Sequence, residues 1–97
     1  MEAQIDNYNT WIEDSDHDRV KSQVEEILIS AGFSVLNFME HHFSPQGYTA
    51  VWLLAESHCA LHTFPEAGKS YVELSSCNRQ MFVDFIRIFN NQFNQTR

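Results

Sequence analysis

The chain has 97 residues, which suffice for one domain with a modest hydrophobic core. Six Lys and Arg against thirteen Asp and Glu give a formal charge of −7, which argues against binding to nucleic acid or to an anionic membrane surface. No apolar run approaches the ~20 residues of a membrane span, the first nine residues do not form a secretory signal, and two cysteines are too few for a disulfide scaffold. We therefore expect a cytoplasmic protein.

The N-terminal part of the chain predicts a short strand followed by a helix. The strand is expected over residues 10–13 and the helix over 16–31. Asp16 is a suitable N-cap, and Gly32 stands where a helix-terminating glycine belongs. The apolar positions of the helix recur with the 3.6-residue period of one buried face: Val20, Val24, Ile27, Leu28 and Ala31.

Four extended segments follow, separated by turn signals. They are rich in β-branched and aromatic residues and cover 33–43, 48–54, 59–64 and 70–76. Ser44-Pro45-Gln46-Gly47 and Pro65-Glu66-Ala67-Gly68 separate the first from the second and the third from the fourth, and both carry the residue types of tight turns. We expect these segments to pair as antiparallel strands.

A second amphipathic helix is predicted over residues 79–93, with Asn78 as its N-cap. Its apolar stripe is aromatic: Phe82, Phe85, Ile86, Phe89 and Phe93. The order of elements indicates an α+β fold, a two-layer α/β sandwich in which an antiparallel sheet carries both helices on one face. The whole chain, 1–97, is expected to form this single domain.

The most reactive segment runs from Glu56 to His62 and holds an acid, a hydroxyl, two imidazoles and a thiol. A metal site is one interpretation, but His58 and His62 on one strand would lie roughly 13 Å apart, too far to share a zinc ion. A serine hydrolase is a second, although Ser57 lacks the glycines of a nucleophile elbow. A third is backbone self-cleavage at the serine, which leaves an N-terminal pyruvoyl group able to form a Schiff base with a substrate amine.

The residues around this segment resemble a known family. Glu56-Ser57-His58-Cys59-Ala60-Leu61-His62-Thr63-Phe64-Pro65-Glu66 is similar to the E-S-H-x-x-x-H-T-W-P-E signature of the prokaryotic-type, pyruvoyl-dependent S-adenosylmethionine decarboxylases, with Phe64 in place of Trp. The resemblance continues upstream in His41-His42-Phe43-Ser44-Pro45-Gln46-Gly47 and downstream to Cys77, twenty residues after Ser57. This chain is identified as a short, divergent member.

The resemblance implies a proenzyme that cleaves itself between Glu56 and Ser57, so that Ser57 becomes a covalent pyruvoyl group and no dissociable cofactor or metal is needed. His62 would act in processing, and Thr49 stands where the family has a serine that assists it. Cys77 would donate the proton that replaces the lost CO₂, a role that suits a thiol with an ordinary pKa of about 8.5.

The same resemblance implies how the substrate is held. Phe43 and Phe64 fall where the family places aromatic rings near adenine, and Glu66 is a candidate for polar substrate contacts. The expected activity is decarboxylation of S-adenosylmethionine in spermidine (polyamine) biosynthesis. Arginine or ornithine as substrate, or a processing-dead homologue that acts as a partner subunit, are the alternatives.

The expected assembly is a homodimer of processed units with active sites near the interface. Apolar residues within 48–54 on the sheet face away from the helices favour such pairing. The family's N-terminal Gly-x-His motif and last strand have no counterpart in this sequence, so we also expect one exposed sheet edge.

Overall fold

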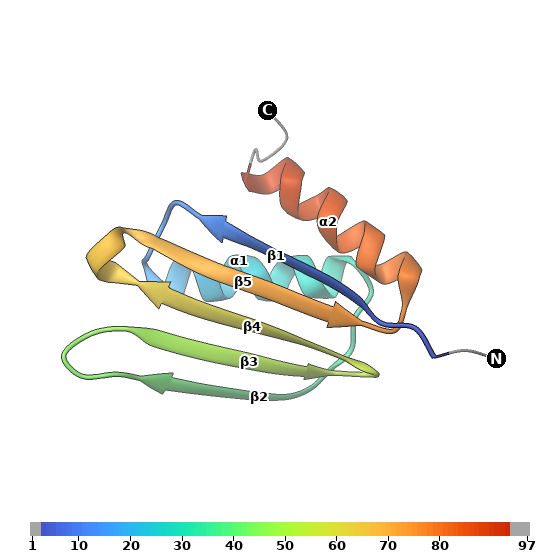
Figure 1. The fold of residues 1–97 in the computed structure, drawn as a ribbon, viewed down its shortest axis with the longest axis horizontal. Helices are drawn as coiled ribbons and strands as arrows, with labels where there is room; N and C mark the ends of the chain where they lie inside the picture. The colour runs from blue at the N-terminus through green and yellow to red at the C-terminus, as the bar shows by residue number, and fades with distance from the viewer. Residues whose placement is uncertain (1–2, 94–97) are drawn as a thin grey trace.

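Five strands form one antiparallel sheet in the computed structural model of the chain, which describes residues 3–93 (Figure 1). The strands lie in the order β1-β5-β4-β3-β2. Their bounds are β1 Asp6–Ile12, β2 Val35–His42, β3 Tyr48–Leu54, β4 Ser57–Phe64 and β5 Lys69–Ser76. Strands that follow one another in the chain from β2 to β5 are neighbours in the sheet. β1 pairs with β5 and forms one edge of the sheet, and β2 forms the other.

Two helices, α1 (His17–Ser30) and α2 (Arg79–Phe93), pack on one face of this sheet (Figure 1). The predicted caps are present, because Asp16 accepts a hydrogen bond from the Arg19 amide and Asn78 accepts one from the Met81 amide. A short 3₁₀ helix, η1 (Pro65–Ala67), joins β4 to β5. The two-layer α+β sandwich expected from the order of elements is confirmed. None of the helices in the described part of the chain has the length and apolarity to cross a membrane.

The core lies between the sheet and the helices. Alternate residues of β3, β4 and β5 point into it, since successive side chains of a strand face opposite ways. The largest side chains with almost no exposed surface are Trp52, Phe85, Phe89, Ile12, Ile27 and Leu28. The Trp52 indole also donates a hydrogen bond to Glu25 of α1, which ties the middle of the sheet to that helix.

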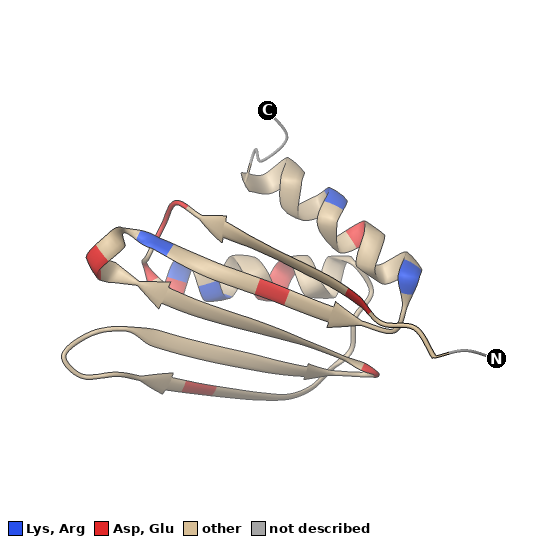
Figure 2. Cartoon of the chain, viewed as in Figure 1, with Lys and Arg blue, Asp and Glu red and all other residues tan. Residues whose placement is uncertain are grey.

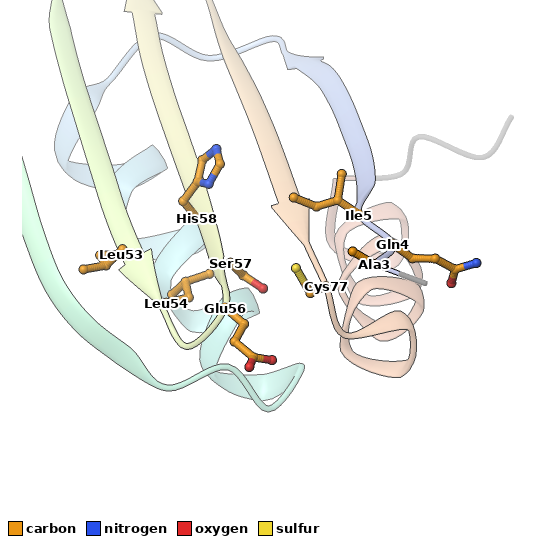
Figure 3. Close-up of a pocket in the computed structure, with 9 residues that line it drawn as sticks. All are labelled: Ala3, Gln4, Ile5, Leu53, Leu54, Glu56, Ser57, His58 and Cys77. Carbon is orange, nitrogen blue, oxygen red and sulfur yellow. The ribbon is translucent and has the colours of Figure 1, made fainter. Parts of the chain in front are cut away.

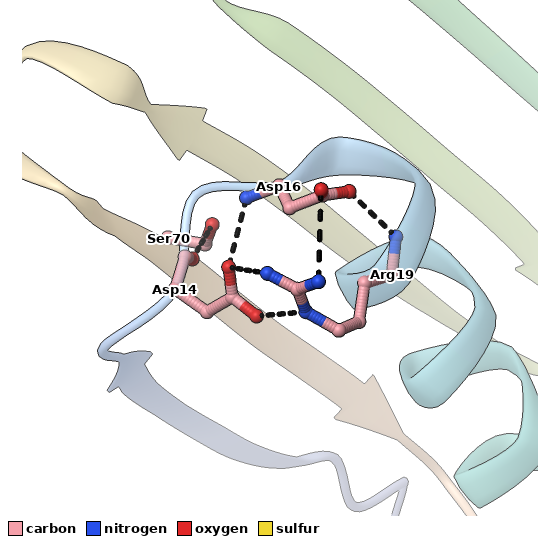
Figure 4. Close-up of polar contacts among 4 residues, drawn as sticks. All are labelled: Asp14, Asp16, Arg19 and Ser70. Carbon is pink, nitrogen blue, oxygen red and sulfur yellow. Dashed lines mark hydrogen bonds and ion pairs between the residues drawn. The ribbon is translucent and has the colours of Figure 1, made fainter.

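Polar contacts fix the connection between β1 and α1 (Figure 4). The Arg19 guanidinium donates two hydrogen bonds to the Asp14 carboxylate, at 2.6 and 3.0 Å. These bonds lower the pKa of Asp14. Ser70 at the start of β5 donates to the backbone carbonyl oxygen of Asp14. The turn is thereby bound to both the helix and the sheet, which holds α1 against the core.

Two strands differ from the sequence-based expectation. The first strand was predicted over 10–13 but spans Asp6–Ile12, because all seven of its residues pair with β5, the polar Asn7 and Asn9 lie on its exposed face, and Asp6 is ion-paired with Arg79 of α2. The strand predicted from 59 begins at Ser57, because Ala55 and Glu56 alone turn the chain and Ser57 already pairs with Leu54.

The sheet face opposite the helices is open and mixes exposed apolar side chains with polar ones such as Asn9, His58 and Glu73. β3 and β4 contain no Lys, Arg, Asp or Glu, and β2 contains only Glu40 (Figure 2). By strand alternation this open face carries the following exposed apolar side chains: Trp11, Met39, Val51, Leu53 and Phe64. An uncovered apolar surface of this kind is typical of an interface rather than of a solvated sheet face.

Candidate active site

The predicted cleavage point lies at the tip of the hairpin between β3 and β4. Glu56 has a φ of 57°, in the left-handed region that residues with a Cβ rarely adopt. Ser57 follows as the first residue of β4, pairs with Leu54 across the hairpin and pairs with Ser76 of β5 on its other side. The Glu56–Ser57 peptide bond therefore joins a strained turn residue to a residue held in the sheet.

Two hydrogen bonds hold the groups on either side of this bond. The backbone amide of Cys77 donates to the carbonyl oxygen of Glu56 at 3.2 Å. The Ser57 hydroxyl donates to the Ser76 hydroxyl at 2.9 Å, and both of these serines are buried. An amide donor on the carbonyl oxygen can stabilise negative charge there, should a nucleophile attack the carbonyl carbon.

A cavity of about 770 Å³ opens beside this turn (Figure 3). Glu56 lines it from the turn between β3 and β4, Ser57 and His58 line it from the start of β4, and Cys77 lines it from the position directly after β5. The Cys77 side chain is exposed, so its thiol can reach a bound molecule. Apolar side chains complete the wall: Ala3, Ile5, Leu53 and Leu54. Sequence analysis assigned no role in cleavage or turnover to His58, which lines this cavity, or to Ser76, which is hydrogen-bonded to Ser57.

The remaining predicted residues gather in a second group at the other end of β4. Thr49 Oγ1 and His62 Nδ1 share a hydrogen bond of 2.9 Å across the paired strands β3 and β4. They line a cavity of about 200 Å³ together with Phe43, Phe64 and Glu66. Phe43 and Phe64 are 50% and 37% exposed, which leaves both rings accessible at the rim of that cavity.

Two aromatic side chains that sequence analysis did not single out extend the second group. The Trp11 ring lies 5.8 Å from the Phe64 ring, between centroids, and 5.2 Å from the Tyr71 ring. Tyr71 in turn stacks on His62 at 6.3 Å. Burial and the Glu73 carboxylate raise the pKa of Tyr71. The available signal was strand alternation, which places Trp11, His62 and Tyr71 on the same sheet face.

The two groups are far apart within one chain. Ser57 and His62 are five residues apart on β4, or about 16 Å at ~3.3 Å per residue. They also point to opposite faces, because Ser57 is buried on the helix side while His62 lies on the open face with Thr49. The structure thus brings Ser57 beside Cys77 and His62 beside Thr49, but does not bring the pairs together.

Neither a metal site nor a second accessible thiol is found among the described residues. Within residues 3–93 no three His, Cys, Asp or Glu side chains are grouped closely enough to bind one ion. Cys59 is fully buried in the core, and that burial strongly raises the pKa of its thiol. Of the two free cysteines, Cys77 is the one available for proton transfer.

The fold and this hairpin define the class of the protein: a two-layer α+β sandwich with a Glu-Ser bond at a strained strand junction and a cysteine against it. The S-adenosylmethionine decarboxylase family matches residues 5–97, and the chain belongs to that family. It is 38% identical over 65 residues to the S-adenosylmethionine decarboxylase proenzyme of Prochlorococcus marinus strain MIT 9211, and 37% identical over 62 residues to that of the archaeon Methanococcus aeolicus.

The matches differ in how much of each protein they cover. The segments shared with these two relatives span 67% and 64% of this chain and 53% of each relative. The crystal structure of the adenosylmethionine decarboxylase from Aquifex aeolicus superimposes with a TM-score of 0.72, over 96% of this chain and 80% of that one, at 24% identity. The chain therefore spans about half the length of the curated relatives, while the fold is shared nearly throughout.

Proposed function

We propose that this chain is a proenzyme that cleaves itself between Glu56 and Ser57 and then decarboxylates S-adenosylmethionine. The observation that supports this most directly is the hydrogen bond from the Cys77 amide to the Glu56 carbonyl oxygen at a strained turn. That carbonyl carbon is the one that the Ser57 hydroxyl must attack. The site thus stabilises charge on the scissile carbonyl and strains the residue that carries it.

The cleavage steps follow from this arrangement. Ser57 Oγ forms a bond to the Glu56 carbonyl carbon, the bond from that carbon to the Ser57 nitrogen breaks, and the hydroxyl proton ends on the released nitrogen. The resulting ester eliminates: a base removes the Ser57 α-proton, and Glu56 leaves as the new C-terminal carboxylate. Water then replaces the nitrogen, which departs as ammonia and leaves a pyruvoyl group at position 57.

Decarboxylation would use the residues around the first cavity. The pyruvoyl carbonyl, joined to a substrate amine, supplies the electron sink for loss of CO₂. Cys77 directly follows β5 and lines the same cavity as Ser57, the first residue of β4. Its thiol is exposed. We assign it the delivery of the proton to the substrate α-carbon. Its backbone amide is used in cleavage and its side chain in turnover, so the two roles can be separated by substitution.

The second group favours S-adenosylmethionine over arginine or ornithine. Phe43 and Phe64 offer accessible ring faces at one cavity, and aromatic rings of this kind stack on a planar base such as adenine. Glu66 lines the same cavity and can accept hydrogen bonds from the ribose or amine groups of the substrate. The amino acids arginine and ornithine have no planar base that would use these rings.

Because the two groups lie about 16 Å apart in one chain, we assign the complete site to a homodimer. The open sheet face is the surface that a second copy would cover. If two copies pack their open faces together about a twofold axis perpendicular to the strands, the strands of the two chains run in opposite directions. This arrangement places the Ser57 end of one chain beside the His62 end of its partner. His62 of the partner subunit, held by its own Thr49, would then approach the Glu56–Ser57 turn from the open face and serve as the acid or base in processing, while the Ser57 hydroxyl stays on the helix side.

The mass of freshly purified protein under denaturing conditions tests the proposed function. Two species are expected: residues 1–56, and residues 57–97 with a pyruvoyl group in place of Ser57. Carbon dioxide release from S-adenosylmethionine, arginine and ornithine then identifies the substrate. A single chain that stays intact for days would contradict self-cleavage and favour a processing-dead partner subunit.

The strain at Glu56 leads to a prediction about both stability and rate. Replacing Glu56 with glycine should raise the free energy of unfolding by up to about 1 kcal/mol, because glycine adopts positive φ without the penalty of a Cβ. Cleavage should slow by about fivefold, since that free energy no longer destabilises the uncleaved state. Stability is measured by urea unfolding in a Ser57→Ala background, where the chain stays whole.

Glu56→Gln is the matched control, because it removes the charge and keeps the Cβ. It should retain the wild-type stability and cleavage rate. Equal slowing in Glu56→Gln and Glu56→Gly would assign the effect to the carboxylate rather than to backbone strain.

A further inference from the structure

The buried hydroxyl of Ser76 touches the nucleophile of the proposed cleavage. Ser57 and Ser76 are directly paired residues of β4 and β5, and their hydroxyl oxygens lie 2.9 Å apart. Ser76 has no exposed surface and Ser57 is 7% exposed. Nothing else in the proposed reaction uses Ser76, although it is the side chain hydrogen-bonded to Ser57 Oγ.

The direction of this hydrogen bond follows from the other contacts of Ser76. The Asn78 amide donates to Ser76 Oγ at 3.0 Å, and the Ser76 hydroxyl proton is directed to the Asn78 carbonyl oxygen at 3.3 Å. Ser76 is thereby held from the start of α2 and has its own proton engaged. The Ser57 hydroxyl is consequently the donor of the pair, and its oxygen lone pairs remain available for the Glu56 carbonyl carbon.

We propose that Ser76 is the positioning residue for self-cleavage: it holds the Ser57 hydroxyl by its proton so that the oxygen can attack the Glu56 carbonyl. The inference rests on the proposed function and concerns its first step. Ser76 neither gains nor loses a proton overall, because the Ser57 proton ends on the released nitrogen. Two consecutive residues thus hold the two reacting groups. The Ser76 hydroxyl holds the Ser57 nucleophile, and the Cys77 amide holds the Glu56 carbonyl oxygen.

Ser76→Ala removes this contact, and Ser70→Ala is its matched control. Ser70 lies on the same strand and the same face, is equally buried, and donates its hydroxyl to the Asp14 carbonyl oxygen far from Ser57. We expect Ser76→Ala to slow cleavage on the order of tenfold, the usual consequence of one lost buried hydrogen bond in a transition state. Ser70→Ala should lower the thermal midpoint and leave the cleavage rate unchanged.

Ser76→Thr retains the hydroxyl and should restore cleavage to near the wild-type rate. If Ser76→Thr does not accumulate in a folded form, Ser76→Ala and Ser70→Ala are compared at equal distances below their thermal midpoints. The readout is the first-order loss of intact chain, followed by mass. A Ser76→Ala chain that cleaves as fast as the wild type, or faster, would overturn the proposal.

Hydroxylamine identifies the step, because it cleaves an ester but not a peptide bond. Positioning of the attack predicts that Ser76→Ala accumulates no ester and gains no cleavage from hydroxylamine. If hydroxylamine restored the wild-type rate of cleavage to Ser76→Ala, Ser76 would act in a step after the attack, which would contradict the proposal. A wild-type chain that stays intact would overturn the proposed function and this inference together, whereas a cleaved wild type with equal Ser76→Ala kinetics would overturn only the inference.

Discussion

A Ser57→Ala chain and a His62→Ala chain should each remain intact alone, yet the His62→Ala chain should be cleaved when the two are produced together. The first lacks the nucleophile, and the second lacks the imidazole that we assign to the site of its partner. In a mixed dimer one of the two composite sites has both groups. Random pairing of equal amounts places roughly half of the His62→Ala chains in such dimers, so about half should be cleaved.

The experiment requires chains with different affinity tags, tandem purification of the mixed dimer and the mass of each chain. His58→Ala is the matched control, because His58 lines the cavity beside Ser57 in its own chain. If His58→Ala slows cleavage, its chain should still cleave slowly in a mixed dimer with a Ser57→Ala chain. A purified mixed dimer whose His62→Ala chain stays intact would contradict the composite site. Normal cleavage of His62→Ala alone would remove His62 from processing.

Cys77→Ala should separate cleavage from decarboxylation. Alanine keeps the backbone amide that donates to the Glu56 carbonyl oxygen, so the chain should still cleave and form its pyruvoyl group. The thiol is lost, and decarboxylation should fall by about 10²- to 10⁴-fold, the usual contribution of a positioned general acid. The measurement is carbon dioxide release from carboxyl-labelled S-adenosylmethionine, normalised to the pyruvoyl fragment determined by mass.

Cys59→Ala is the control for this substitution. Its thiol is buried in the core on the helix side of β4, with a raised pKa, and it lines neither cavity. The variant should lose stability through the small cavity it creates, while turnover per pyruvoyl group keeps the wild-type value and pH profile. Failure of Cys77→Ala to cleave would show that the thiol itself takes part in processing. Undiminished turnover would exclude it as the proton donor.

Regular elements were the most predictable part of the molecule. The helix expected over 79–93 has those bounds, because its Phe and Ile residues repeat with the helical period and Asn78 caps it. The strand expected over 10–13 was underestimated, since most of it consists of Asp, Asn, Tyr and Thr, which show no clear apolar alternation. Its length depends on pairing with β5, whose residues lie 58 (Ile12 to Ser70) to 70 (Asp6 to Ser76) positions further along the chain.

The turn at Glu56 could not be predicted from residue type. Glutamate and alanine are not turn-forming residues, and glutamate has no intrinsic preference for positive φ. The conformation is imposed by the strands on either side, which pair up to Leu54 and Ser57 and leave two residues to reverse the chain. Local preference here yields to tertiary pairing, so the fold holds a strained residue at the bond where we propose cleavage.

The sequence by itself determined the fold class and the set of reactive groups, because helical and strand periods are local properties and the motif spacings are written along the chain. Only the tertiary structure decided which groups meet. Strand alternation and hairpin register placed Ser57 against Ser76 and His62 against Thr49, on opposite faces and at opposite ends of β4. Register depends on contacts between distant segments, so residues that are close in one motif can lie in two separate groups, which we propose a second chain brings together.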